Sequence, residues 1–131
     1  MFRAKSGHEV AKYGDRVYEW RRIVTVAVQA AHDGAPLDGP VAVSMLFELE
    51  RPRSHFSTAR GRELELRPSA PAYPAVAPDV DKLVRGVCDA ITDAGNVWAD
   101  DAQVVRISAS KVYVDAGSVP GVTVRVCRVT T

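Results

Sequence analysis

A regular alternation of apolar and polar side chains from Val41 to Leu49 most constrains how this chain folds. The odd-numbered positions of the segment are all apolar, whereas Ser44 and Glu48 lie on the opposite face. A period of two places alternate side chains on opposite faces of a β-strand. The segment therefore predicts a half-buried strand whose apolar face is covered by a second layer.

Two other segments show the three- and four-residue spacing of apolar side chains that is typical of amphipathic helices. We expect the first helix to begin at Asp15, its N-cap, and to stop at Gly34, although its β-branched residues also suit a strand. The second helix opens at Pro78-Asp79 and ends at Gly95, where a glycine C-cap is expected. Two further strands are predicted, over about 103–114 and 122–129.

This order of elements predicts an α+β fold: a small mixed β-sheet with two main helices packed on it. A chain of 131 residues fits a single domain, 1–131. Residues 1–14 are polar and are expected to form an N-terminal arm. Residues 51–78 hold five of the eight prolines and are expected to form a long, basic, proline-rich loop, with a short strand piece at Leu64 and Leu66.

The overall composition excludes several classes of protein. The net charge of +1 argues against a uniform polycation that coats nucleic acid. No stretch approaches the roughly 18 consecutive apolar residues of a membrane span, and the N-terminus shows no apolar signal core. The two cysteines do not make a disulfide framework. We therefore expect a cytoplasmic protein with no membrane partner.

The balanced charge hides a separation of acids from bases along the chain. Six aspartates lie between positions 79 and 101, whereas Arg51, Arg53, Arg60 and Arg62 lie in a stretch without an acid. A protein that binds a polyanion through metal ions would separate its charges in this way. Ordinary solvated faces would do so too.

The first pair of these acids, Asp79 and Asp81, stands at the start of the second helix. Because an N-cap residue has non-helical dihedrals, both carboxylates could converge on one point, although Asp at these positions is also what an ordinary helix start favours. The second pair, Asp100-Asp101, follows the helix and lies about 20 Å from its start. Either the strand that follows runs back beside the helix, or a second subunit supplies the partner.

Aspartate carboxylates without histidine or thiolate are hard ligands that suit Mg²⁺, with Mn²⁺ as a possible substitute. Such a site activates water and stabilises charge on a phosphoryl group. Lys111 shares the more apolar face of its predicted strand. It could neutralise an Asp, contact a phosphate oxygen, or extend to water from the strand end.

The segment 78–111 resembles the RusA family of Holliday junction resolvases, which are crossover junction endodeoxyribonucleases. The resemblance rests on Asp79-Val80-Asp81, Leu83, Val87, Asp89-Ala90, Gly95, the run Asp100-Asp101-Ala102-Gln103-Val104 and Lys111. It implies a small α+β homodimer, of a kind that phages and prophages encode, that uses Mg²⁺ to cut four-way DNA junctions by paired nicks. It also implies that Asp79, Asp81 and Asp101 bind the metal and that Asp100 supports them.

The chain departs from the family pattern at three places. Lys82 stands where the family commonly has Asn, and Arg85 stands where many members have a lysine. Arginine keeps the positive charge but is a poorer proton donor than lysine. The family's first strand has no recognisable counterpart in the sequence.

The resulting hypothesis is a Mg²⁺-dependent, structure-selective DNA endonuclease that uses metal-activated water. Its catalytic group would be Asp79, Asp81, Asp100, Asp101, Arg85 and Lys111, and its DNA-binding group would be Arg51, Arg53, Arg60, Arg62 and Lys82. Two alternatives are a non-catalytic DNA-binding module that retains the RusA fold, and a structural dimer whose acids only cap and solubilise.

Overall fold

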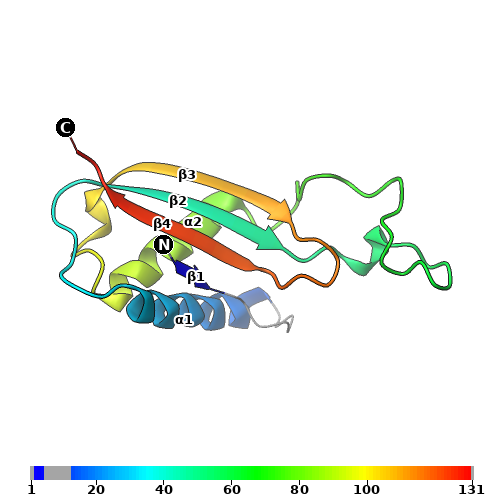
Figure 1. The fold of residues 1–131 in the computed structure, drawn as a ribbon, viewed down its shortest axis with the longest axis horizontal. Coiled ribbons are helices and arrows are strands. Elements are labelled where there is room, and N and C mark those ends of the chain that lie inside the picture. Colours follow the sequence, from blue (N-terminus) through cyan, green and yellow to red (C-terminus); the bar gives the residue numbers. More distant parts are fainter. Residues whose placement is uncertain (1, 5–12, 131) are drawn as a thin grey trace.

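Four strands form one mixed sheet in the computed structural model, which describes residues 2–4 and 13–130 (Figure 1). They are β1 (Phe2–Ala4), β2 (Val41–Leu49), β3 (Val104–Tyr113) and β4 (Gly121–Arg128), in the spatial order β1-β4-β2-β3. β2 pairs parallel with β3 and antiparallel with β4, and β4 pairs antiparallel with β1. With the two long helices, this confirms the predicted α+β fold with a small mixed sheet.

Helices α1 (Tyr13–Ala31) and α2 (Val80–Ala94) make the second layer. The core lies between them and one face of the sheet: Val24 of α1, Ile91 of α2 and Phe47 of β2 are almost completely buried. On the other face of β2, Ser44 and Leu46 are exposed. The alternation in β2 therefore separates core from solvent, as the sequence predicts.

Side chains at the C-terminal end of each helix bond the last carbonyls of the other helix. The Asn96 side chain donates hydrogen bonds to the carbonyls of Gln29 and His32, at 3.2 and 3.1 Å, and Gln29 Nε2 donates to the Ala94 carbonyl at 3.3 Å. The last carbonyls of a helix have no partner within the helix. These contacts therefore fix where α1 ends, at Ala31, and not at Gly34 as the sequence predicts.

The N-terminal segment differs most from the sequence-based expectation. Residues 2–4 form β1 on the sheet edge beside β4, so the expected arm over 1–14 is wrong for these residues. α1 begins at Tyr13, which places Asp15 inside the helix and not at its N-cap. The remainder of the expected arm, 5–12, lies outside the described residues. Nowhere in the part described is there a helix long and apolar enough to cross a membrane.

Because β2 and β3 are parallel, their C-terminal ends lie at the same end of the sheet. From that end the loop 51–78 projects away from the two layers, and α2 then runs back toward the start of β3 (Figure 1). Within the loop, a short 3₁₀ turn η1 (Arg53–His55) precedes a single bridge between Phe56 and Leu66. The predicted strand piece is thus reduced to this one bridge, with Leu64 exposed.

Candidate metal centre

The start of α2 presents two carboxylates. Asp79 is the N-cap residue with extended dihedrals (φ −72°, ψ 137°), but its side chain makes no capping hydrogen bond. It instead lies 3.2 Å from the Lys82 ammonium, and Asp81 is exposed in the first helical turn. Both acids lie at the positive end of the helix dipole, where negative side chains are common. Since the Asp79 carboxylate is not used for capping, it is available to a cation.

Lys111 fixes the backbone that leads into this helix. Its ammonium donates hydrogen bonds to the carbonyls of Val76, at 2.6 Å, and Pro78, at 2.8 Å. Its partners here are backbone carbonyls, and the contact with a phosphate oxygen that the sequence suggests stays a prediction. The C-terminal part of β3 thereby holds Pro78, the residue directly before Asp79.

Asp100 and Asp101 stand at the other end of β3. Asp100 is the N-cap of the 3₁₀ turn η2 (Asp101–Gln103), and Asp101 is its first residue. Asp100 Oδ1 accepts a hydrogen bond from the Ala102 amide at 2.9 Å, and Gln103 Oε1 accepts from the Asp100 amide at 3.2 Å, which completes a capping box. Gln103 Nε2 also donates to the carbonyls of Leu37 and Gly39, both at 2.9 Å. Asp100 therefore has the local capping role, and both Asp100 and Asp101 are exposed.

The carboxyls of Asp100 and Asp101 share one hydrogen bond, which shifts their two pKa values in opposite directions. The Ala102 amide, and after it the hydrogen bond with Asp101, lower the pKa of Asp100. The hydrogen bond to Asp100 raises the pKa of Asp101, and the negative charges of Asp100 and Asp89 add to this. Burial raises the pKa of the Cys88 thiol to about 11, with help from Asp101 and Asp89. The charges of Asp89 and Asp101 therefore act on each other, and η2 contacts α2.

Asp89 is the neighbour of Asp101 that sequence reasoning missed as a site residue. Its carboxylate lies 3.8 Å from Arg21 of α1, which also binds Asp93 at 2.7 Å. A signal for it was present: Asp81, Arg85 and Asp89 follow one another at intervals of four and share one face of α2. Arg85 is exposed on this face, between the two acids.

The structure therefore divides the predicted carboxylates into two groups. Asp79 and Asp81 stand at the start of α2. Asp101 interacts electrostatically with Asp89, which lies a rise of about 12 Å further along the helix from Asp81. Within residues 2–4 and 13–130, no three acidic, His or Cys side chains come together around one point. Oxygen ligands of this kind nevertheless fit Mg²⁺, which is often held by one or two carboxylates together with substrate phosphates.

The predicted DNA-binding arginines differ in their surroundings. Arg51 is anchored, since its Nη1 donates to the Pro71 carbonyl at 2.7 Å and its guanidinium lies 4.4 Å from the centre of the Tyr113 ring. Arg53, Arg60 and Arg62 are exposed on the projecting loop. Lys82 lies outside this loop and pairs with Asp79.

A comparison with protein-family models matches nearly the whole chain. The family model described as endodeoxyribonuclease RusA matches residues 1–127, which include β1, both helices and all four predicted site aspartates. No curated protein matches the chain. With nearly its whole length matched, the chain belongs to the RusA family, and it is an endodeoxyribonuclease of the kind that acts on branched DNA.

Proposed function

We propose that this enzyme is a Mg²⁺-dependent, structure-selective endonuclease that resolves Holliday junctions by paired nicks. The observation that carries the proposal is the start of α2, where the Asp79 carboxylate is free of any capping bond and stands next to the exposed Asp81. This acidic pair lies at the end of the sheet from which the arginine-bearing loop projects. Negative ligands for a metal and positive contacts for phosphates thus come from neighbouring segments.

Asp79 and Asp81 would hold the ion, and Lys111 would keep them in place through the carbonyls of Val76 and Pro78. When bound there, Mg²⁺ supplies an activated water for attack on the phosphodiester and stabilises the leaving oxygen. Arg85 lies one turn after Asp81 and would stabilise the charge that develops on the phosphate.

Asp101 would complete the site from a second copy of the chain. It interacts with Asp89, about 12 Å along α2 from Asp81, and the described residues of one chain bring no third acidic, His or Cys side chain to Asp79 and Asp81. A homodimer offers two such sites related by two-fold symmetry, which matches the symmetry of a four-way junction. Asp100 supports Asp101 through their shared hydrogen bond.

The exposed loop residues Arg53, Arg60 and Arg62 would bind backbone phosphates. Arg51 contributes chiefly by fixing the base of the loop. Lys82 now pairs with Asp79 and would release that carboxylate to the metal, so that its ammonium can turn to a phosphate.

The direct test is cleavage of a labelled four-way junction, with and without Mg²⁺, by the wild-type protein and by Asp81→Asn. We expect Asp81→Asn to bind the junction and to leave it uncut. Asp33→Asn, an exposed change in the turn after α1, is the matched control and should cut normally. Retained cleavage by Asp81→Asn would contradict the metal assignment. Binding without cleavage by the wild-type protein would instead support a DNA-binding module that retains the fold.

A further inference from the structure

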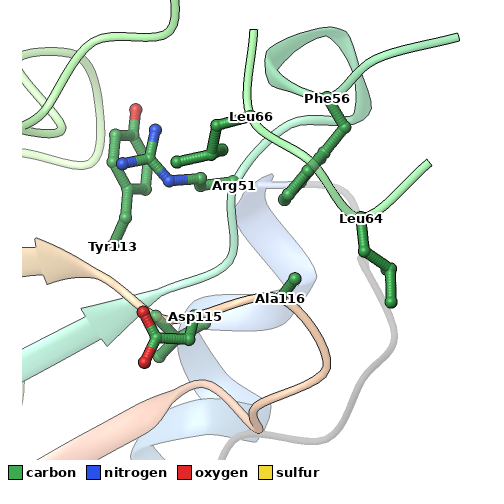
Figure 2. Close-up of a pocket in the computed structure, with 8 residues that line it drawn as sticks. Arg51, Phe56, Leu64, Leu66, Tyr113, Asp115 and Ala116 are labelled. Carbon is green, nitrogen blue, oxygen red and sulfur yellow. The ribbon is translucent and has the colours of Figure 1, made fainter. Parts of the chain in front are cut away.

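A small pocket of about 220 Å³ lies between the base of the loop 51–78 and the turn 114–120 that follows β3 (Figure 2). One wall comes from the loop and the other from the strand end and turn. Its principal lining residues are Arg51, Phe56 and Leu66 on the loop side and Tyr113, Asp115 and Ala116 on the other. Its volume is below the roughly 300 Å³ at which pockets for drug-sized ligands begin, and suits one small ring system.

The walls of this pocket are held in place by contacts within the chain. The guanidinium of Arg51 stacks on the Tyr113 ring, and the His55 ring meets Tyr113 edge-on, with ring centres 5.3 Å apart. The bridge between Phe56 and Leu66 joins the two sides of the loop. A preformed site of this kind binds without paying to order its own side chains.

The chemistry of the lining fits a nucleobase. Phe56 and Leu66 offer apolar surface, and Leu66 remains 49% exposed although it lines the pocket. Stacking on such surfaces is tolerant of base identity. The Asp115 carboxylate, on the turn side, can accept hydrogen bonds from the amino or ring N–H groups of a base. Arg53, Arg60 and Arg62 of the same loop are exposed and would be available to the attached phosphates.

The position of the pocket relates it to the proposed metal centre. Tyr113 lies two residues beyond Lys111 on the same face of β3, a step of about 7 Å. Lys111 in turn contacts Pro78, the residue before Asp79. A base held against Tyr113 would therefore bring its flanking phosphates toward Asp79 and Asp81.

We propose that this pocket accepts one unstacked base of a branched DNA strand, next to the phosphate that is cut. The inference rests on the proposed function and deepens it, because a base that leaves the stack at a branch point distinguishes a junction from an ordinary duplex. Selectivity for branched DNA would then come in part from this pocket.

The test measures binding of synthetic four-way junctions in EDTA, so that cleavage does not interfere. One junction is unmodified, and each of the others carries a single abasic nucleotide at one position next to the branch point. We expect one abasic position to weaken binding by the wild-type protein at least about fivefold. Ala116→Phe, which fills the pocket, should bind the unmodified junction more weakly by a similar factor and should no longer distinguish it from the abasic one.

Val119→Phe places the same side chain on the same turn but outside the pocket lining, at a residue that is 46% exposed, and should behave like the wild-type protein. Leu66→Ala removes part of the opposite wall and should reproduce the loss, which guards against a folding defect in Ala116→Phe.

The proposed role of the pocket is contradicted if the wild-type protein binds junctions and no abasic position weakens binding. It is also contradicted if Ala116→Phe still distinguishes the abasic junction from the unmodified one. Either result leaves the proposed function intact. If the wild-type protein neither binds nor cuts a four-way junction in Mg²⁺, the proposed function fails and the base pocket fails with it.

Discussion

At the scale of single residues, Lys111 links the sheet to the start of α2. Its ammonium holds the carbonyls of Val76 and Pro78, and charge-assisted hydrogen bonds of this kind are stronger than neutral ones. In Lys111→Met the segment before Asp79 loses both bonds. Because supporting contacts of a metal site typically change metal affinity about 10-fold or more, we expect cleavage to need a correspondingly higher Mg²⁺ concentration.

A Mg²⁺ titration of the cleavage rate separates this positioning role from direct contact with the DNA. If Lys111 acts through Asp79, Lys111→Met approaches the wild-type rate once Mg²⁺ is saturating, and Lys111→Arg restores part of the metal affinity. A rate that stays low at every Mg²⁺ concentration would mean that the ammonium acts on the phosphate itself.

We expect Asp101 to lower the stability of the metal-free protein at neutral pH. Its pKa is raised in the folded state, so it favours folding below the ordinary Asp pKa and disfavours it as the pH rises through the raised value. Asp101→Asn removes the repulsion from Asp100 and Asp89 and keeps a donor for the shared hydrogen bond. Thermal unfolding without metal should therefore show a higher Tm for Asp101→Asn at pH 7, with a difference that shrinks toward pH 4.

The same variant should lose cleavage, so that stability and activity change in opposite directions. Asp33→Asn, which lies far from these acids in sequence, should not show the pH-dependent gain. A lower Tm for Asp101→Asn at pH 7 would contradict the raised pKa.

At the scale of elements, the projecting loop supplies the exposed phosphate contacts. Replacing Arg53, Arg60 and Arg62 together by Ala should reduce the slope of log K against log salt concentration by about 2 to 3, since each phosphate contact contributes about 0.7 to 0.9. Cleavage at saturating DNA should change little. Arg22→Ala, on the exposed part of α1, is the control and should leave the slope unchanged. An unchanged slope for the triple variant would remove the loop from the DNA interface.

How well each element could be predicted depends on whether its cause is local. β2 coincides with the predicted segment because its alternation runs over nine residues, and α2 begins after Asp79 and ends before Gly95 because both ends carry their own signals. β1 has three residues and gains its structure only by pairing with β4, so no local pattern marks it. The end of α1 depends on Asn96, which is 64 residues from His32.

The candidate site follows the same rule. Asp79 and Asp81 could be found because a helix start is readable from the sequence and gathers adjacent acids. The interaction of Asp101 with Asp89 could not, because it depends on where η2 is held, and Gln103 holds η2 against the segment between α1 and β2 through the carbonyls of Leu37 and Gly39. Sequence spacing correctly raised the question of whether these acids meet, but only the packing answers it.

At the scale of the whole molecule, the separation of Asp101 from Asp81 favours a site shared by two chains. In that arrangement each site takes Asp81 from one copy and Asp101 from the other. Asp81→Asn and Asp101→Asn should each be inactive alone. A mixed dimer of the two variants contains one site with both changes and one site with neither, so mixing should restore nicking.

Random mixing makes half of the dimers mixed, and each has one of its two sites intact, so the nicking rate should reach roughly a quarter of the wild-type rate. The product should be a nicked junction and not a resolved one, because the second site of each mixed dimer is inactive. If both acids instead acted within one chain, every site in the mixture would lack one of them, and no nicking would return. Subunit mixing therefore decides whether the acids that one chain keeps apart are brought together by its partner.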